Sequence, residues 1–406
     1  MRKNNLLADL FHAYYDTRKN KRNTINQLRF EMDMEQHLYD LYRQIRERRY
    51  EPKPSLAFIV FKPVQREVFA ADFSDRVVHH LFFNYVSPLF ENTYIEDCYS
   101  CRKGKGTSYA VKRLERHLRS CSNNHTCPCF VLKLDMQGYF MSIDRNILYS
   151  MITRTLEKFA DRQDSKGVKW KDRLDYDLVM YLAEVIIFND PTKKYHIKGS
   201  RSDWVGLPPS KSLFYSGEGR GLPIGNLTSQ LFSNIYLSGF DNYIKRKLKF
   251  KHYGRYVDDF FLADTDKERL KAAIPKIDAY LHDKLRIKLH PKKIYLQPYG
   301  NGVLFTGGYL KPHRTYIGNR VKGNMNKGLA ELKKQNNPDL NALRSSVNSY
   351  LGVMKHYKSF YIRREIMIKQ AWVFKYGYVQ NCCSVFRLNR PGRNIVTIGP
   401  DAAVHT

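Results

Sequence analysis

The chain has 406 residues, 43% of them hydrophobic, and Lys plus Arg exceed Asp plus Glu by 69 − 39 = 30. This length can bury a substantial core, which we expect to be divided among several subdomains that share one fold. The excess of positive charge favours a nucleic-acid partner, and an aromatic content of 14% argues against a generally basic protein of the ribosomal type.

The N-terminal region, residues 1 to about 50, is predicted to be helical. Its apolar residues recur at helical spacing, at Leu38, Leu41, Tyr42 and Ile45. Prolines at positions 52 and 54 end this pattern. The opening sequence MRKNNLLADLFHAYY lacks the unbroken apolar run of a secretion signal, and no later stretch is long enough for a membrane span. We therefore expect a cytoplasmic protein with no membrane partner, and an odd number of cysteines, seven, agrees with a reducing compartment.

Cysteines and a histidine crowd into the segment CSNNHTCPC, at Cys121, His125, Cys127 and Cys129. These residue types can bind zinc, but the spacing lacks two separated CxxC-like pairs. A polar turn between a helix and the following strand is the preferred interpretation. Whether Cys121, Cys127 and Cys129 bind a metal stays open.

Three carboxylates follow or lie between predicted strands. Val131–Asp135 is an apolar run that ends in an acid, and Asp258 and Asp259 lie in HYGRYVDDFFLAD, where alternating apolar residues predict two strands joined by a turn. Adjacent aspartates repel each other unless water or a cation separates them, and hard oxygen ligands suit Mg²⁺ held jointly with substrate phosphates. A solvated hairpin turn is the alternative for the adjacent pair, since Asp favours turns.

A glycine-rich loop and a helix are predicted between the two acidic sites. Residues from about 160 to 220 read as a polar insertion, and its length indicates a functional surface. The loop GLPIGN then leads into the apolar-periodic segment SQLFSNIYLSGFDNYIKRKL, where Ser and Thr favour a helix start.

Helices are predicted to return from about residue 320 to 375. One apolar face there consists of Leu343, Val347, Tyr350, Leu351 and Met354, with Lys and Arg elsewhere. Such a face can belong to a region that packs on a nucleic-acid duplex, and a plain helical bundle would show the same stripe. The last thirty residues carry no functional signal.

From about residue 50 to about 364, the order of an acidic strand, a glycine loop with its helix and a YxDD hairpin resembles the reverse transcriptases. Further segments agree: FKPVQREVFAADFSDRVVHH and YSCRKGKGTSYAV resemble the two fingers blocks, and VLFTGGYL resembles the primer grip. The resemblance implies an α+β right-hand polymerase with fingers, a ferredoxin-like palm and a helical thumb. The domains it implies are an N-terminal helical extension (1–50), fingers and palm (51–310), a thumb (311–378) and a C-terminal tail (379–406).

The resemblance also assigns roles to single residues. Asp135, Asp258 and Asp259 would be catalytic and would hold two Mg²⁺ ions, for which Mn²⁺ could substitute. The residues implied to bind the incoming nucleotide are Lys62, Arg66, Phe140, Ile224, Gly225, Gln230 and Lys293. The primer grip would include Gly307 and Gly308. Phe140 would leave no room for a 2′-hydroxyl and so would select deoxynucleotides. An ordinary core position for Phe140 and a solvated surface position for Lys293 are the alternatives.

The finer resemblance is to the reverse transcriptases of diversity-generating retroelements. Ile224 stands before the loop glycine, where other branches usually have Gln, and Ser229-Gln230 replaces their Ser-Pro. This implies an RNA-directed DNA polymerase that copies a dedicated non-coding RNA into cDNA, binds RNA/DNA duplex and deoxynucleoside triphosphates, and works with an accessory protein. An aliphatic residue cannot make the hydrogen bond of a Gln, so the copying is expected to be error-prone.

Three alternatives remain beside this interpretation. An antiphage-defence reverse transcriptase would make cDNA from a partner non-coding RNA. An RNA-binding scaffold on a retired polymerase fold would be favoured by the loss of an acid, and none is lost. An RNA-dependent RNA polymerase would share the acids but usually lacks a bulky residue at the Phe140 position.

Overall fold

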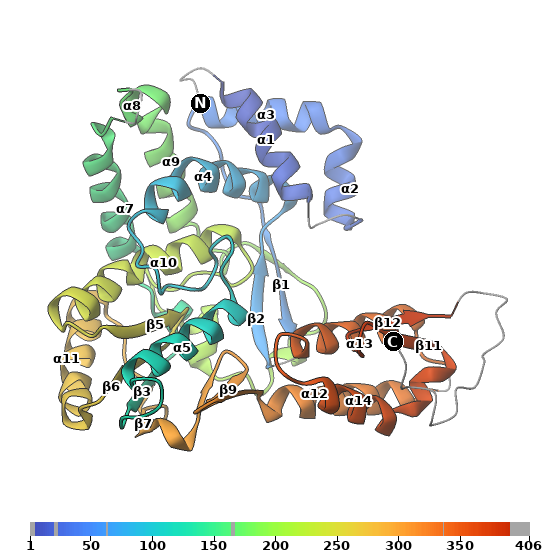
Figure 1. Cartoon of the computed structure of the whole chain (residues 1–406). Coiled ribbons are helices and arrows are strands. Elements are labelled where there is room, and N and C mark those ends of the chain that lie inside the picture. Colours follow the sequence, from blue (N-terminus) through green and yellow to red (C-terminus); the bar gives the residue numbers. More distant parts are fainter. Residues whose placement is uncertain (1–4, 20–22, 62–63, 164–166, 336, 390–406) are drawn as a thin grey trace. The chain divides into compact units, whose positions relative to one another are not determined.

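The computed structural model describes residues 5–19, 23–61, 64–163, 167–335 and 337–389 of a mixed α+β chain (Figure 1). The chain divides into two compact units. The first unit consists of Met1–Gly106 and Cys129–Gln297, and the second unit consists of Thr107–Pro128 and Pro298–Thr406. Among the site residues predicted from the sequence, Lys62 lies outside the described parts, and the others lie within them.

A four-stranded sheet forms the centre of the first unit, with strand order β5-β6-β3-β7. Its strands are β3 (Phe130–Asp135), β5 (His252–Tyr256), β6 (Asp259–Asp264) and β7 (Tyr295–Pro298). The helices around it are α6 (Tyr139–Ser142), α7 (Arg145–Ala160), α10 (Leu227–Asn242) and α11 (Lys267–Leu285), and a π-helical turn, η4 (Tyr243–Lys247), continues α10. Helix α11 packs on β3 and β6, and α10 packs on α7. The two predicted strands around the acid pair are thus confirmed as β5 and β6.

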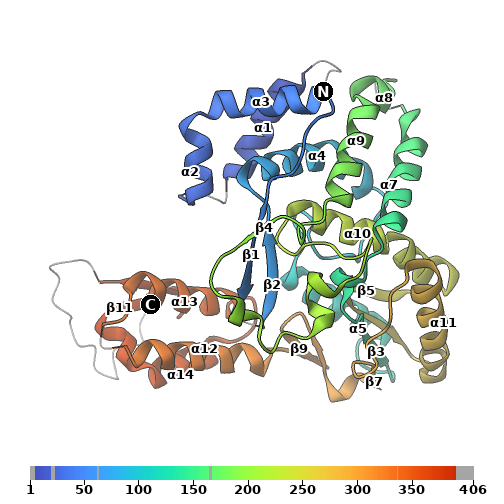
Figure 2. The same ribbon diagram turned by 180° about the vertical axis from the view of Figure 1, so that it is seen from behind.

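A second sheet of the first unit has the order β2-β1-β4. It pairs β1 (Ser55–Val60) antiparallel with β2 (Arg66–Ala70) and parallel with the short β4 (Tyr195–Ile197), as seen from behind in Figure 2. Strand β4 lies more than a hundred residues beyond β1 in the chain, so the predicted insertion contributes a strand to this sheet.

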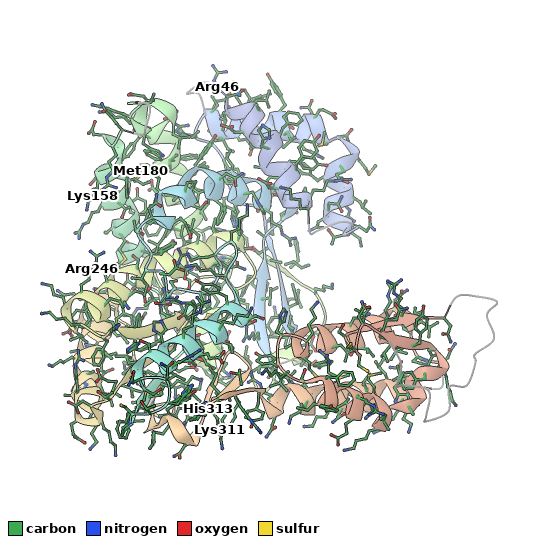
Figure 3. The ribbon with its side chains drawn as sticks, viewed as in Figure 1. Arg46, Lys158, Met180, Arg246, Lys311 and His313 are labelled. Carbon is green, nitrogen blue, oxygen red and sulfur yellow. The ribbon has the colours of Figure 1, made fainter. Side chains whose placement is uncertain are left out.

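The N-terminal part of the first unit contains four helices among its described residues. They are α1 (Leu6–Arg18), α2 (Ile25–Met32), α3 (Met34–Arg46) and α4 (Phe73–Glu91). Leu38, Leu41 and Ile45 of α3 are buried, which confirms the predicted helical face, and Tyr42 is half-buried. Arg46, Lys158 and Arg246 are exposed and extend outward from this unit (Figure 3), as expected for a strongly basic chain.

The stretch predicted as a polar insertion is only partly polar. It contains α8 (Trp170–Arg173), α9 (Tyr176–Phe188) and three 3₁₀ turns, η1 (Arg201–Trp204), η2 (Pro209–Lys211) and η3 (Leu213–Tyr215). Helix α9 is apolar and buries Val179, Leu182 and Ala183 completely in the main core, against α7 and α4. The prediction was wrong for this helix, because Lys- and Asp-rich flanks hid an apolar run.

The predicted helix after the glycine loop is confirmed as α10, but Ser and Thr do not cap it. Asn226 is the N-cap residue, and its side chain accepts a hydrogen bond from Ala71 N (3.1 Å) instead of capping the helix. Thr228 and Ser229 lie buried in the first turn. The loop is therefore tied to the end of β2.

The second unit contains α5 (Thr107–Cys121), a three-stranded sheet in the order β10-β9-β8, and a two-stranded sheet β11-β12. Its other elements are β8 (Val303–Phe305), β9 (Gly308–Lys311), β10 (Arg314–Ile317), α12 (Asn319–Lys333), α13 (Leu340–Met354), α14 (Phe360–Lys369), β11 (Gly377–Gln380) and β12 (Val385–Leu388), with 3₁₀ turns η5 (Tyr299–Asn301) and η6 (Ala371–Lys375). The predicted apolar face on α13 is confirmed. Tyr350 is half-buried against the core of this unit, and the other four residues of the face are completely buried, namely Leu343, Val347, Leu351 and Met354. None of the described helices has the length and apolar character needed to cross a membrane.

A buried carboxyl in the first turn of α4 makes stability depend on pH. Asp75 accepts hydrogen bonds from Tyr50 Oη (2.7 Å) and from Lys53 N (2.9 Å). Burial raises the pKa of Asp75 from 3.8 to about 7, and the charge of Asp72 acts in the same direction while the Tyr50 and Lys53 contacts oppose it. Between these two pKa values the folded state binds more protons than the unfolded state, so stability falls as the pH rises.

Asp75→Asn is expected to flatten this part of the pH dependence. From pH 4 to pH 7 the wild type should lose on the order of 3 kcal/mol of unfolding free energy relative to the variant, because the amide does not titrate. Above pH 7 the difference between the two proteins should stay constant. Urea denaturation at several pH values measures it. Asp172→Asn, at an exposed position on α8, serves as the control. If the unfolding free energies of wild type and the Asp75 variant changed with pH in the same way, the prediction would be wrong.

Candidate active site

The strand register brings the three predicted acids to one end of the central sheet. Asp135 at the end of β3 pairs with Asp259 at the start of β6, directly across the antiparallel ladder. Tyr256 of β5 also pairs with Asp259, so Val257 and Asp258 are the two loop residues of the hairpin. Like charges placed directly opposite each other on neighbouring strands are unfavourable. This arrangement is therefore one that needs positive charge nearby.

The titration of the acids reflects this crowding. Burial raises the pKa of Asp258 to about 6, and the charge of Asp135 adds to the increase, while Lys293 and Arg66 oppose it. Burial likewise raises the pKa of Asp259 to about 6 against the opposing effect of Lys133. The Oδ1 atom of Asp259 is buried without a hydrogen-bond partner among the described residues.

Two lysines supply positive charge at the acids. Lys293 Nζ lies 3.0 Å from both carboxylate oxygens of Asp135, and Lys133 Nζ lies 3.1 Å from Asp259 Oδ2. Lys293 was predicted as a site residue and Lys133 was not. The signal for Lys133 was available, because residues two apart on a strand share a face and Lys133 precedes Asp135 by two positions.

The three acids have the chemistry, but not the grouping, of a site for a hard divalent cation. Within the described residues, no three His, Cys, Asp or Glu side chains are grouped so that they could hold a metal ion, and two of the acids are paired with lysine amines. Carboxylate oxygens are nevertheless the ligands that Mg²⁺ prefers, and a buried carboxylate oxygen without a partner is what a cation would satisfy. Asp135, Asp258 and Asp259 are thus chemically suited to Mg²⁺.

The hairpin turn that carries Asp258 has an unusual backbone. Val257 has φ +58°, a region that β-branched residues rarely adopt. Its N–H donates to Ser100 Oγ (3.1 Å) and its carbonyl accepts from Arg255 Nη1 (2.9 Å). The conformation is therefore held from both sides of the residue by neighbours outside the turn itself.

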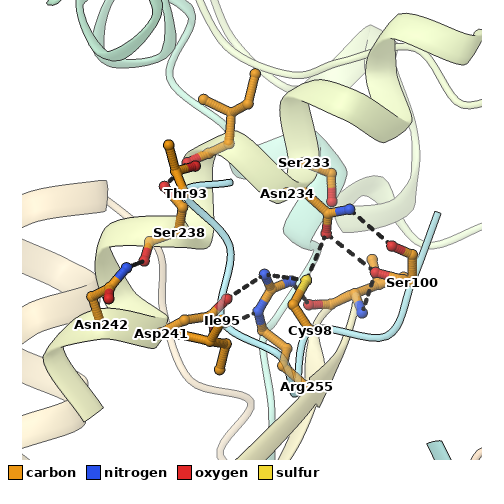
Figure 4. A network of polar contacts seen from close by, with 12 residues as sticks. Thr93, Ile95, Cys98, Ser100, Ser233, Asn234, Ser238, Asp241, Asn242 and Arg255 are labelled. Carbon is orange, nitrogen blue, oxygen red and sulfur yellow. Dashed lines mark hydrogen bonds and ion pairs between the residues drawn. The ribbon is translucent and has the colours of Figure 1, made fainter. Parts of the chain in front are cut away.

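Arg255 is the centre of a buried polar network beneath this turn (Figure 4). Its Nε and Nη2 atoms bind Asp241 Oδ1 and Oδ2 of α10, both at 2.7 Å, and neither side chain is exposed to solvent. Tyr253 Oη donates to Asp241 Oδ1 (2.6 Å), and Arg255 Nη2 lies 3.3 Å from Cys98 Sγ. Two charges buried without water need such a bidentate geometry to be stable.

The network continues from Cys98 and Ser100 to Asn234 of α10. Asn234 Oδ1 accepts from Cys98 Sγ (3.4 Å) and Ser100 Oγ (3.2 Å), and its Nδ2 donates to Ser100 O (2.8 Å). The turn, α10 and the segment around residue 100 are thus joined through one set of contacts. Sequence reasoning missed Arg255, Asp241 and Asn234.

Several predicted nucleotide-binding residues surround a small apolar cluster. Phe140 and Ile224 are half-buried and pack against the cluster that includes Phe69 and Leu213. Phe69 N donates to Ile224 O (3.0 Å), which fixes the glycine loop along β2. Gly225 has φ +126°, and a Cβ there would lie 2.8 Å from Val68 Cγ1, so the position requires glycine.

Arg66 and Gln230 are both exposed, at the start of β2 and in the second turn of α10. The charge of Arg66 acts on Asp258, which places this predicted basic residue near the acids. The other basic residue predicted in this segment, Lys62, lies outside the described residues.

Gly307 and Gly308 belong to the second unit. Thr306 and Gly307, with φ +45° and +94°, form the two-residue turn between β8 and β9. A Cβ on Gly308 would lie 2.8 Å from Val111 Cγ2 of α5, so this glycine allows close packing of the hairpin on that helix. Their role as a primer grip stays a prediction.

The segment CSNNHTCPC begins with Cys121, the last residue of α5, and continues as a turn. Ser122 Oγ accepts from His125 N (3.0 Å), and the His125 ring lies 4.5 Å from that of His313 and 5.7 Å from that of Tyr299. None of the seven cysteines, all of which lie in the described ranges, forms a disulfide.

No protein-family model matches the sequence. The chain is 22% identical over 276 residues to Protein YkfC of Escherichia coli (strain K12), a match that covers 60% of this chain and 62% of that protein. Solved structures of telomerase are similar to this chain at low sequence identity. Telomerase from Candida albicans, with a TWJ fragment of telomeric RNA, has a TM-score of 0.46 at 13% identity, covering 84% of this chain and 60% of that one. Apo telomerase from Candida tropicalis has a TM-score of 0.45 at 13% identity, covering 80% and 59%. The chain thus spans less than two thirds of the length of these proteins.

Proposed function

We propose that the protein is an RNA-directed DNA polymerase that copies a dedicated non-coding RNA into cDNA. The observation that carries the proposal is the strand register, which sets Asp135 opposite Asp259 with Asp258 in the adjoining turn. Acids that are more than a hundred residues apart in the chain meet at one sheet end, beside Lys293 and Arg66. Carboxylates with basic residues around them suit transfer of a nucleotide from a triphosphate.

In this proposal the fold is that of a right-hand polymerase. Residues 51–310 form fingers and palm, 311–378 the thumb, 1–50 a helical extension and 379–406 a tail. Deoxynucleoside triphosphates are the proposed substrates, because Phe140 would lie beneath the sugar and its ring would exclude a 2′-hydroxyl. An accessory protein is a further proposed partner.

The three acids would hold two Mg²⁺ ions. When bound, these ions lower the pKa of the primer 3′-hydroxyl and neutralise charge on the triphosphate and its leaving group. The side chains of the protein position the reactants. Lys293 is bonded to Asp135 in the structure, and in the reaction its amine would turn to the phosphates. Arg66 would hold the triphosphate from the side of β2, and Phe140 would orient the sugar.

Primer extension tests the activity directly. The purified full chain, with an RNA template, an annealed DNA primer, Mg²⁺ and deoxynucleotides, is expected to extend the primer to the template end. The same reaction with ribonucleotides should give little product. Efficient extension by ribonucleotides on the RNA template would favour an RNA polymerase, and binding without extension would favour the retired scaffold.

Fidelity separates the mutagenic function from the antiphage function. Ile224→Gln is expected to lower misincorporation opposite template adenines several-fold, since one regained hydrogen bond contributes on the order of 1 kcal/mol. Sequencing of cDNA from both enzymes on one template measures it. Ile224→Val keeps the aliphatic character and controls for packing in the apolar cluster. A wild-type error spectrum that is low, flat and unchanged by Ile224→Gln would favour the defence function.

A further inference from the structure

The segment of residues 193–220, here called the insertion loop, is fastened to β2 by one buried carboxylate. Glu67 is 1% exposed. It accepts hydrogen bonds from Trp204 Nε1 (2.6 Å), Ser212 Oγ (2.8 Å) and Leu213 N (2.5 Å). Three donors from two parts of the loop meet at this single group, so the loop has a fixed path.

Further contacts hold the same loop. Gln65 Nε2 donates to Asp203 O (2.9 Å) and Val205 O (3.2 Å). At the start of the loop, Tyr195 belongs to β4, which pairs with β1, and its ring lies 5.3 Å from that of Phe214. The insertion loop is therefore attached to this sheet near its start, through β4, and again further along, through Glu67 of β2.

This fixed loop exposes large apolar and aromatic side chains. Val205 is 79% exposed, Tyr215 is 72% exposed and Phe214 is 39% exposed. Each follows an anchored residue closely in the chain. Because Trp204, Ser212 and Leu213 share one carboxylate, their chain neighbours lie within roughly 20 Å of one another. Exposed apolar and aromatic side chains that lie close together can form a binding surface.

The charge of the insertion loop indicates what binds there. Its basic residues outnumber its acids by 6 − 2 = 4, and they are Lys193, Lys194, Lys198, Arg201, Lys211 and Arg220. In the described part of the chain none of these six forms an ion pair with an acid. One of the two acids, Asp203, accepts from Ser200 N in a capping box. Lysine is depleted in protein interfaces, whereas aromatic and basic side chains together suit single-stranded nucleic acid.

The loop also approaches the acids. Gly138, three residues beyond Asp135, has φ +55°, and a Cβ there would lie 2.6 Å from Ser210 O. Leu213 packs in the apolar cluster against which Phe140 lies. A strand bound on the exposed side of the loop would thus lie close to the end of β3.

We propose that the insertion loop is a docking surface for single-stranded RNA. Tyr215 stacks on a base, and Arg201 and Lys211 bind phosphates beside it. Identifying this strand as the template entering the site rests on the proposed function, whereas RNA binding by the loop does not need catalysis.

Fluorescence anisotropy with a labelled, unstructured RNA of about 12 nucleotides tests the surface, in the absence of nucleotide and Mg²⁺. Tyr215→Ala in the full chain is expected to weaken binding about 5-fold or more. The variant Arg201→Ala/Lys211→Ala should reduce the slope of log affinity against log salt by about 1.4, since each phosphate contact contributes about 0.7. Tyr39→Ala on α3, where the side chain is 47% exposed, and Lys276→Ala/Lys284→Ala on α11 are the matched controls and should bind as wild type.

The outcomes separate this inference from the polymerase proposal. Weaker binding by the loop variants, with controls unchanged, supports the docking surface even if no primer is extended. Wild-type affinity and salt slope in both loop variants overturn it, even if the enzyme is an active polymerase. Equal loss in loop and control variants would also overturn it, because binding would then follow net charge alone. Thermal unfolding of each variant confirms that these exposed substitutions leave the fold intact.

Discussion

Asp258→Asn is expected to reduce primer extension by about 10³-fold or more, because it would remove one of the three proposed metal ligands, at the point where the hairpin meets Asp135. RNA affinity should remain close to that of the wild type, since the proposed RNA-binding surface consists of basic and aromatic residues elsewhere. The free energy of unfolding should not decrease. Burial raises the pKa of Asp258 to about 6, with repulsion from Asp135 adding to it, so the amide removes an unfavourable charge.

Single-turnover extension, RNA anisotropy and urea denaturation measure these three quantities on one preparation. Asp264→Asn, at the far end of β6, removes a carboxylate from the same strand and should keep extension near the wild-type rate. Wild-type extension by the Asp258 variant would show that the acids at the sheet end are not the catalytic ones.

The second large effect is expected at the buried ion pair of Arg255 and Asp241. Arg255→Met alone leaves Asp241 buried without its partner, which should destabilise the protein by about 3–5 kcal/mol. In the double variant Arg255→Met/Asp241→Leu, apolar side chains replace both charges, and most of the stability should return. Extension should stay about 10- to 100-fold below wild type, because the Val257 carbonyl has lost its donor and the turn that carries Asp258 can shift.

Tyr253→Phe is the matched control for this network. It removes one hydrogen bond to Asp241 but leaves the contact between Arg255 and Val257, so it should lower stability by about 1 kcal/mol and spare the rate. Thermal unfolding and the rate at saturating nucleotide measure both effects. A double variant that is stable and as fast as wild type would mean that the ion pair serves folding alone.

The parts of the site that follow a local period could be predicted from the sequence. Alternation around the acid pair predicted β5 and β6, and an apolar run predicted β3. Asp135 was thus placed correctly at a strand end, and Asp258 in the turn between two strands. Lys133 lies on the same face as Asp135 and could have been found by the same rule.

Other features depend on contacts between distant residues. Arg255 sits in a strand and its partner Asp241 in a helix fourteen positions earlier, and no periodicity links a buried charge to its partner. The hydrogen bonds between Glu67 and the insertion join residues more than 130 positions apart, so composition predicted a polar insertion but not the fixed path of its loop. The stretch around α9 was interpreted as polar because charged flanks surround its apolar centre. Only the packing of α9 on α7 and α4 shows that it belongs to the core.

The bond between Lys293 and Asp135 means that this site carries its own counterion at rest. Any cation that binds Asp135 must compete with an ammonium group that is already in place, so the apparent cation affinity is lower than that of the bare carboxylates. A triphosphate that attracts Lys293 would remove the competitor. Cation and nucleotide would then strengthen each other's binding by the same factor, and the lysine would act as a thermodynamic link between them without touching both at once.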